Sequence, residues 1–223
     1  MEDSYGAGYV CGALCSRGFI VWNKKYSNYC IALETGDEGF AKMFYENLAG
    51  FSKKLPKMGL NKRHYKGSLR QTTTVKLWGK KHVKLLAEKW GLRTGRDRWQ
   101  VPEAAFRDEA FGKGFLKGFF DGRGNMHVRI FREKGTGKVK KSRSIRISSV
   151  NKNGIERIKI LLNQEGIKAL LYQSLGNTIM EIHGKANLQQ FEAVVGFSMP
   201  ERQAILKEAL MPLSIAEEMK GDE

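Results

Sequence analysis

The sequence lacks three features that would place the protein in a membrane or outside the cell. No apolar run reaches the roughly 18 residues that a membrane-spanning helix needs. Among 223 residues there are only three cysteines, which are too few, and odd in number, for a disulfide scaffold. The first residues include the acids Glu2 and Asp3 instead of the positive charge of a secretory signal. We therefore predict a cytoplasmic protein with no membrane partner.

Common catalytic and metal-binding patterns are also missing. There is no Ser/His/Asp arrangement and no glycine-rich phosphate loop. Cys11, Cys15 and Cys30 have no evident fourth ligand, so buried thiols are expected instead of a zinc site. The sequence by itself therefore predicts neither a metal centre nor a bound cofactor.

Acidic residues are scarce in two particular segments. The chain has 39 Lys and Arg against 23 Asp and Glu, a formal net charge of +16. Residues 53–98 hold fifteen basic and two acidic residues, and residues 123–146 hold nine basic and one acidic residue. The remainder of the chain is net negative. Two separate basic segments favour contact with a polyanion, above all nucleic acid, over a generally solvated charged surface.

A pattern of glycines reveals an internal repeat. Gly6, Gly8, Gly12, Arg17 and Gly18 recur 106 residues later as Gly112, Gly114, Gly118, Arg123 and Gly124. Residues 75–80 resemble residues 180–185 at an offset of 105. The sequence therefore predicts a tandem duplication, with residues 1–103 as the first repeat and residues 104–223 as the second.

Each repeat has the pattern helix, two strands, helix, two strands, helix. In the first repeat we expect helix 7–17, strands 19–23 and 29–33, helix 37–51, hairpin 64–78 and helix 80–91. In the second we expect helix 108–122, strands 126–133 and 142–149, helix 152–165, hairpin 168–183 and helix 185–196, followed by helix 200–211. The expected fold is α+β, with a four-stranded antiparallel sheet backed by helices in each αββαββα repeat.

The duplicated glycines predict close helix packing. Gly8 and Gly12 lie one turn apart on one helix face, and Gly114 and Gly118 repeat this spacing. Without side chains, such positions let two helix backbones approach each other. Gly18 follows the first helix, where a left-handed residue commonly ends a helix.

Alternation along the strands separates an apolar face from a polar, basic one. In residues 72–78, Val75 and Leu77 fall on one face, and Lys76 and Trp78 on the other. A basic outer face is typical of a sheet that reads a groove of nucleic acid. The residues that we predict to contact nucleic acid are Arg70, Lys76, Trp78, Arg129, Lys138, Lys140, Arg146 and His183.

The two glycine-rich helices, residues 10–18 and 116–124, resemble the LAGLIDADG motif. Two such motifs about a hundred residues apart are similar to the monomeric LAGLIDADG homing endonucleases, which are typically intron-encoded, and the resemblance covers essentially the whole chain. It implies motif helices packed at a pseudo-twofold axis. It also implies two saddle-shaped sheets that straddle double-stranded DNA over an asymmetric site of roughly two helical turns.

The sequence departs from this family at its metal-binding acids. The resemblance places those acids at the positions of Arg17 and Arg123. A guanidinium group has no lone pair to donate to Mg²⁺. We therefore expect no intact catalytic acid and no metal, with Mg²⁺ binding only if the acids were restored. By the same resemblance, Lys80 and Lys185 are candidate basic residues near the phosphates.

The predicted function is sequence-specific binding of double-stranded DNA with cleavage lost or strongly impaired. One alternative is an RNA-binding intron maturase or splicing cofactor, and another is an active endonuclease that uses non-standard acids. A third is a transcriptional repressor. The arginines themselves have three interpretations: a clamp on the DNA backbone, simple caps of the helix ends, or an engineered replacement of the acids.

Overall fold

The computed structural model describes residues 4–23, 25–65 and 68–212. The first repeat contains α1 (Ser4–Ser16), β1 (Gly18–Asn23), β2 (Asn28–Thr35), α2 (Glu38–Ser52), β3 (Lys57–Tyr65), β4 (Ser68–Trp78), α3 (Lys80–Lys84) and the π-helical turn η1 (Leu85–Lys89). The second contains α4 (Ala104–Arg107), α5 (Glu109–Arg123), β5 (Asn125–Arg132), β6 (Val139–Ser149), α6 (Lys152–Gln164), β7 (Leu170–Ser174), β8 (Asn177–His183), α7 (Lys185–Val194) and α8 (Pro200–Leu210). In the described part of the chain, no helix is long and apolar enough to cross a membrane.

Both repeats form a four-stranded antiparallel sheet with the same strand order. The orders are β1-β2-β4-β3 and β5-β6-β8-β7. In the first sheet, Ile31 pairs with Leu77 across β2 and β4, and both side chains are buried. Ile145 pairs with Ile182 in the equivalent position of the second sheet, again buried. The predicted α+β fold with two helix-backed sheets is confirmed, because period-two alternation already separates the two faces of each strand.

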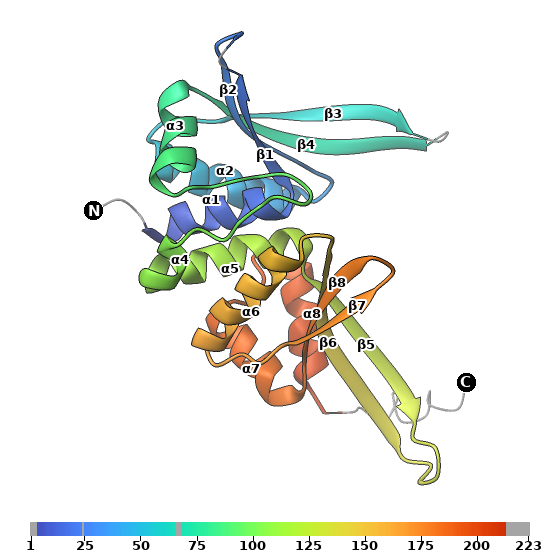
Figure 1. The fold of residues 1–223 in the computed structure, drawn as a ribbon. Coiled ribbons are helices and arrows are strands. Elements are labelled where there is room, and N and C mark those ends of the chain that lie inside the picture. The colour runs from blue at the N-terminus through green and yellow to red at the C-terminus, as the bar shows by residue number, and fades with distance from the viewer. Residues whose placement is uncertain (1–3, 24, 66–67, 213–223) are drawn as a thin grey trace.

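The two motif helices, α1 and α5, lie side by side at the centre of the molecule (Figure 1). Every residue of α1 from Gly6 to Ser16 is buried, which is typical of a helix surrounded by protein on all sides. One continuous hydrophobic core runs from these helices into both sheets. In Figure 1 the β3–β4 and β5–β6 hairpins both project to the right of the helices, whereas β1 and β2 run upward.

The β3–β4 hairpin begins earlier than predicted. β3 starts at Lys57 and not at residue 64. This hairpin projects beyond the helices (Figure 1), so Met58 and Leu60 on the helix-facing side are 44% and 62% exposed. A strand without a buried face has no need for apolar alternation, and the pattern therefore missed it. The turn of the predicted hairpin, residues 66–67, lies outside the described residues.

The predicted left-handed conformation of Gly18 is wrong. Gly18 begins β1 and is not among the residues with positive φ. A Cβ atom at this position would lie 2.5 Å from Cδ2 of Leu14 and 3.0 Å from the carbonyl oxygen of Ala32. The position requires glycine for space at the helix-to-strand junction and not for backbone conformation.

The ends of the helical segments differ from prediction in two further places. The expected helix 80–91 is a short α-helix followed by η1, which widens the last turn. The second repeat begins with the additional helix α4, before α5. Between η1 and α4 lies a loop that crosses the end of α1.

Candidate nucleic-acid interface

The motif helices pack in parallel through their glycines. A Cβ atom on Gly8 would lie 2.1 Å from the carbonyl oxygen of Phe111, and one on Gly12 would lie 2.0 Å from that of Phe115. The same holds in reverse, because a Cβ atom on Gly114 or Gly118 would lie 2.1 or 2.2 Å from a carbonyl oxygen of α1. The two backbones are in direct contact, so the C-termini of both helices meet at one point.

Arg17 and Arg123 lie at this meeting point and cross over to each other's helix. The Nε of Arg17 donates to the carbonyl oxygen of Gly122 at 2.9 Å. The Nε of Arg123 donates to the carbonyl oxygen of Ser16 at 2.8 Å, and its Nη1 donates to that of Ser148 at 3.3 Å. The last carbonyls of a helix lack intrahelical partners and carry its negative dipole end. Each arginine therefore caps the helix of the other repeat.

The cross-capping accumulates positive charge at the junction. Burial lowers the pKa of Arg123, and the positive charges of Arg17 and Arg96 lower it further. Like charges disfavour one another in this way when no anion lies between them. An anion placed at the junction would relieve this repulsion.

The side chains at the junction do not fit the divalent metal that the family resemblance implies. Mg²⁺ is held by oxygen ligands, chiefly carboxylates, whereas Arg17 and Arg123 present N–H donors. Across the described residues, no group of three or more His, Cys, Asp or Glu side chains comes together. The junction therefore presents donors suited to a phosphate and not ligands suited to a metal.

Asp121, two residues before Arg123, is a buried structural carboxylate. It is fully buried, and it accepts hydrogen bonds from the Tyr9 hydroxyl at 2.8 Å and from the backbone N–H of Ser198 at 2.9 Å. Its counterpart Cys15 has the same task in the first repeat, because the Cys15 thiol donates to the carbonyl oxygen of Gln100 at 3.5 Å. Cys15 thus holds the segment that follows η1, and Asp121 holds the segment that follows α7.

Replacing Asp121 by asparagine is expected to change how stability depends on pH. Burial raises the pKa of Asp121 above its ordinary value of 3.8, although hydrogen bonds from Ser198 and Tyr9 and the charge of Lys117 oppose this. The folded protein therefore binds this proton more tightly than the unfolded chain. The resulting stabilisation is fully present below pH 3.8 and is lost as the pH rises through the raised pKa.

Urea unfolding of the wild type and of Asp121→Asn over a pH series measures this contribution. The free energy of unfolding of the wild type minus that of the variant should fall with rising pH, because asparagine cannot ionise. The subtraction removes the contributions of all other carboxylates. A difference that stays constant across the series would contradict a raised pKa for Asp121.

The outer face of the first sheet, the face turned away from the helices, carries three of the predicted contact residues. Lys76 lies at its centre, in register with Lys57 of β3. The Nζ of Lys57 lies 5.8 Å from the ring centroid of Trp78, which is 43% exposed. Arg70 lies farther along β4 and is also exposed. Basic side chains and the aromatic ring of Trp78 thus share this face, an arrangement suited to phosphates and bases.

The outer face of the second sheet is more mixed in charge. The Nε of Arg146 lies 3.0 Å from Glu181, and Lys140 pairs with Glu133. Burial tends to raise the pKa of Glu181, but hydrogen bonds from Ser144, Arg146 and Tyr172 outweigh it and leave that pKa lowered. These two basic residues are therefore partly neutralised within the protein, so they present less charge than the sequence indicates.

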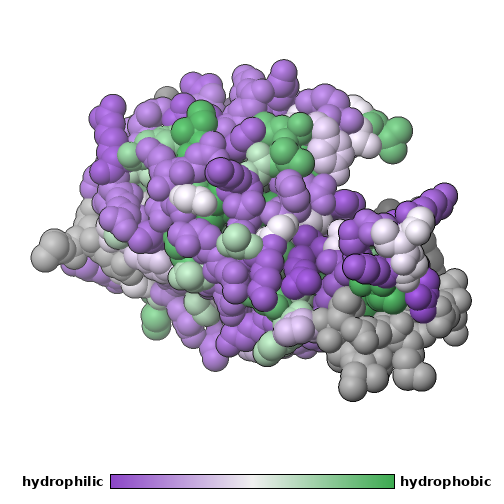
Figure 2. Space-filling model, turned by 90° about the horizontal axis from the view of Figure 1, so that it is seen from below, coloured by the Kyte–Doolittle hydropathy of each residue, from purple (hydrophilic) through white to green (hydrophobic). Residues whose placement is uncertain are grey.

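The remaining predicted contacts of the second repeat lie around one groove and one turn. Arg129 is exposed on β5, Lys138 lies in the β5–β6 turn, and His183 is exposed at the end of β8. A groove of about 440 Å³ on this face is lined by His127, Arg129, Phe131, Ser142, Ser144 and Arg146, among others. Figure 2 views the molecule from the side of the second repeat, where hydrophilic side chains dominate and one edge of the surface is hollowed.

Lys80 and Lys185 occupy equivalent positions at the beginnings of α3 and α7. Both are exposed, and the Nζ of Lys80 lies 5.7 Å from the ring centroid of Tyr29. Each follows a central strand, β4 or β8, after a single glycine. Their role near a phosphate remains a prediction.

Part of the basic segment 123–146 does not face the outer surface at all. Arg143 donates to the carbonyl oxygen of Ala209 at 2.6 Å, and Lys141 to that of Glu208 at 3.4 Å. Both therefore contact the C-terminal end of α8 on the helix side of the sheet. Both lie an even number of residues from the buried Ile145, which already indicated that side of the strand, but a count of charges along the segment does not separate the two faces.

The charge pattern includes Arg93, Arg96 and Arg98 in the basic segment 53–98 but does not single them out, and it does not indicate Arg202. Arg202 donates to the carbonyl oxygen of Asp121 at 2.7 Å and lies 3.4 Å from a carboxylate oxygen of Asp37. Arg93, Arg96 and Arg98 occupy the loop that crosses the end of α1. None belongs to a motif or a strand, so no local pattern marked them as site residues.

The fold and the junction together define a two-repeat α+β protein with paired motif helices, two partly basic sheets and a pair of arginines where the helices end. Residues 110–196 match the family model described as LAGLIDADG-like domain. No curated protein shows a significant sequence match to the chain.

Solved structures share the fold over nearly the whole chain. The homing endonuclease I-WcaI bound to its DNA recognition sequence has a TM-score of 0.64 and 14% identity, covering 96% of this chain and 89% of that one. I-DmoI in complex with DNA and Ca has a TM-score of 0.59 and 13% identity, covering 93% and 100%. The N-terminal LAGLIDADG domain of DUF199/WhiA has a TM-score of 0.51 and 13% identity, covering 99% and 87%. The resemblance to the two-repeat LAGLIDADG homing endonucleases is therefore confirmed in fold and by the family match of the second repeat.

Proposed function

We propose that this protein binds double-stranded DNA in a sequence-specific manner and has lost cleavage or retains it only weakly. The observation that carries the proposal is the reciprocal pair Arg17 and Arg123 at the point where the two motif helices and the two sheets meet. The outer faces of the sheets supply basic and aromatic side chains on either side of this point. An asymmetric site of roughly two helical turns suits two sheets of unlike surface chemistry.

The junction is suited to holding a phosphate without cutting it. The Nε–H of Arg17 is used in the cross-cap, and its two terminal nitrogens have no hydrogen-bond partner within the described part of the chain. Two parallel N–H donors of one guanidinium match two oxygens of one phosphate. A guanidinium neutralises the phosphate, but it neither ligates a metal nor accepts a proton from water. These properties support binding without hydrolysis.

DNA is the bound partner in the similar solved structures of I-WcaI and I-DmoI. I-WcaI was solved bound to its DNA recognition sequence, and I-DmoI in complex with DNA together with Mn or Ca. Those complexes include a divalent metal in the case of I-DmoI, whereas the junction of this chain presents arginines. We therefore propose DNA as the partner and do not assign a metal to it.

Selection from a random pool of duplex DNA tests the proposal. The protein is mixed with the pool at about 150 mM salt, which suppresses non-specific phosphate binding, in the presence of Mg²⁺, and the retained molecules are sequenced. We expect an asymmetric consensus of about two helical turns. Incubating that duplex with the protein and Mg²⁺ should leave both strands intact.

Other outcomes would identify the alternatives. Absence of a consensus, with affinity that falls uniformly as salt rises, would contradict sequence-specific DNA binding. Tighter binding to structured RNA than to any duplex would favour a role in intron splicing. Site-specific strand breaks that disappear with a chelator would show an active nuclease and contradict the proposed loss of cleavage.

A further inference from the structure

The loop between the two repeats is held firmly at the junction. We define the arginine loop as residues 93–98. The Cys15 thiol contacts the backbone at both ends of the arginine loop. Its sulfur lies 4.0 Å from the carbonyl oxygen of Arg93 and 3.5 Å from that of Gln100. The backbone N–H of Ile20 donates to Oγ1 of Thr94 at 3.2 Å. The first repeat therefore fastens this loop to the end of α1 and the start of β1.

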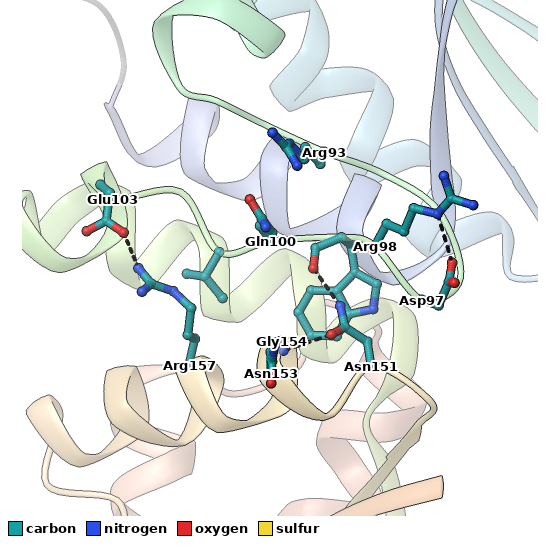
Figure 3. Close-up of a pocket in the computed structure, with 11 residues that line it drawn as sticks. Arg93, Asp97, Arg98, Gln100, Glu103, Asn151, Asn153, Gly154 and Arg157 are labelled. Carbon is teal, nitrogen blue, oxygen red and sulfur yellow. Dashed lines mark hydrogen bonds and ion pairs between the residues drawn. The ribbon is translucent and has the colours of Figure 1, made fainter. Parts of the chain in front are cut away.

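The second repeat holds the other side of the loop through Trp99. The Trp99 side chain is 1% exposed, and its ring lies 5.0 Å from that of Phe119 in α5. Asn151 at the start of α6 donates from Nδ2 to the carbonyl oxygen of Trp99 at 2.5 Å (Figure 3). A Cβ atom on Gly154 would lie 2.5 Å from the Trp99 ring, so α6 is shaped to receive it. A loop fixed from both repeats presents its tip in one place.

The tip of the arginine loop consists of exposed charged residues. Gly95 has a φ of +128°, a conformation that side chains disfavour, and it turns the chain outward. Arg96, Asp97 and Arg98 follow and are all exposed. Arg98 lies 3.7 Å from Asp97 (Figure 3), but such an exposed pair contributes little to stability. No hydrogen bond or ion pair of Arg96 is found within the described ranges.

Arg96 belongs electrostatically to the same site as Arg17 and Arg123. Burial is the main cause of the lowered pKa of Arg123, and the positive charges of Arg17 and Arg96 both lower that pKa further. The second repeat also places an arginine near the junction, Arg202, which lies in the helix α8. Arg202 is used internally, against the Asp121 carbonyl oxygen and the Asp37 carboxylate. Of these two arginines, the one in the inter-repeat loop remains available to a ligand.

We propose that the arginine loop is a third DNA-contacting element, in which Arg96, assisted by Arg98, binds backbone phosphates at the middle of the DNA site. This inference rests on the proposed DNA-binding function and extends it to a segment outside both sheets. The loop would place its contacts beside the phosphates that face Arg17 and Arg123. Because Arg202 is used internally, these contacts would act on one side of the centre.

The test compares Arg96→Ala and Arg96→Ala/Arg98→Ala with the wild type on the selected duplex. Binding is followed by fluorescence anisotropy over a series of salt concentrations. Each lost phosphate contact should lower the slope of log affinity against log salt by about 0.9. Lys207→Ala, which removes an exposed charge on α8, should leave the slope unchanged.

Duplexes with neutral methylphosphonate linkages locate the contact. Neutral linkages at the centre should weaken wild-type binding but have little further effect on Arg96→Ala. Neutral linkages near the ends should weaken both proteins alike. Unchanged melting temperatures, measured by circular dichroism, would show that the exposed substitutions leave the fold intact.

Each outcome bears on a different claim. If the wild type binds no duplex, the proposed function fails and this inference fails with it. If the wild type binds but the loop variants keep its salt slope and its sensitivity to central neutral linkages, the inference alone is overturned. Coupling of Arg96 to terminal linkages would likewise overturn its placement at the centre.

Discussion

Gly12→Ala is expected to destabilise the protein strongly. The added Cβ atom would lie 2.0 Å from the carbonyl oxygen of Phe115 and 2.8 Å from the backbone nitrogen of Phe119. These are main-chain atoms of α5 and cannot move aside as a side chain can. We expect a loss of at least about 4 kcal/mol in the free energy of unfolding, which is a large share of the roughly 5–15 kcal/mol of a typical protein.

The loss is large because separating the helices breaks several interactions together. The cross-caps from Arg17 to Gly122 and from Arg123 to Ser16 span the same contact. The apolar side chains around α1 also belong to one core shared by both repeats. Urea unfolding followed by circular dichroism measures the change.

Gly50→Ala is the matched control. Gly50 lies in α2, and a Cβ atom there would meet no other atom within 4 Å. Alanine at such a helical position should stabilise the protein by about 0.5–1 kcal/mol. If Gly12→Ala cost less than about 1 kcal/mol, the helix contact could not be as close as the structure shows.

The double variant Arg17→Asp/Arg123→Asp is expected to acquire Mg²⁺-dependent cleavage of the selected duplex. Two carboxylates would then lie at the helix ends beside the carbonyl oxygens of Ser16 and Gly122, which now accept from the arginines. Carboxylate and carbonyl oxygens are the ligands that Mg²⁺ prefers, and a bound metal lowers the pKa of its water. Gel electrophoresis of the labelled duplex detects the cut strands.

The same variant should be less stable than the wild type without metal. It loses two cross-capping hydrogen bonds, each contributing about 1 kcal/mol. Each carboxylate would also face the negative end of a helix, at a cost of about 0.3–1 kcal/mol. Added Mg²⁺ should recover part of the melting temperature, because a ligand that binds only the folded state stabilises it.

Arg17→Ala/Arg123→Ala separates these effects. It loses the same hydrogen bonds but gains no ligand, so Mg²⁺ should change neither its melting temperature nor the DNA. If the aspartate variant bound the selected duplex yet showed no response to Mg²⁺ in either assay, the junction would not be a converted metal site. Cleavage by the wild type itself would contradict the proposed role of the arginines.

The sequence by itself determined the duplicated architecture and the sheet faces. Glycines at a spacing of four, repeated after 106 residues, marked both motif helices. Period-two alternation placed Lys76 and Arg146 on outer faces, as the strand registers show. These features can be identified locally, because side chains of a helix or strand return to the same face every few residues, and the sequence shows the same period of apolar and polar residues. The start of β3 was not predicted because this strand has no buried face, so its sequence does not alternate between apolar and polar residues.

Only the tertiary structure decided how the charges of the site are used. The partners of Arg17 and Arg123 are main-chain carbonyls about 105 residues away, and every residue has such a carbonyl, so no sequence pattern could identify them. The burial of Asp121 and the free position of Arg96 likewise depend on segments that meet only after both repeats have packed. The sequence encodes which side chains are present at the junction, but the contact between two helix ends determines which of them are satisfied internally and which remain for a ligand.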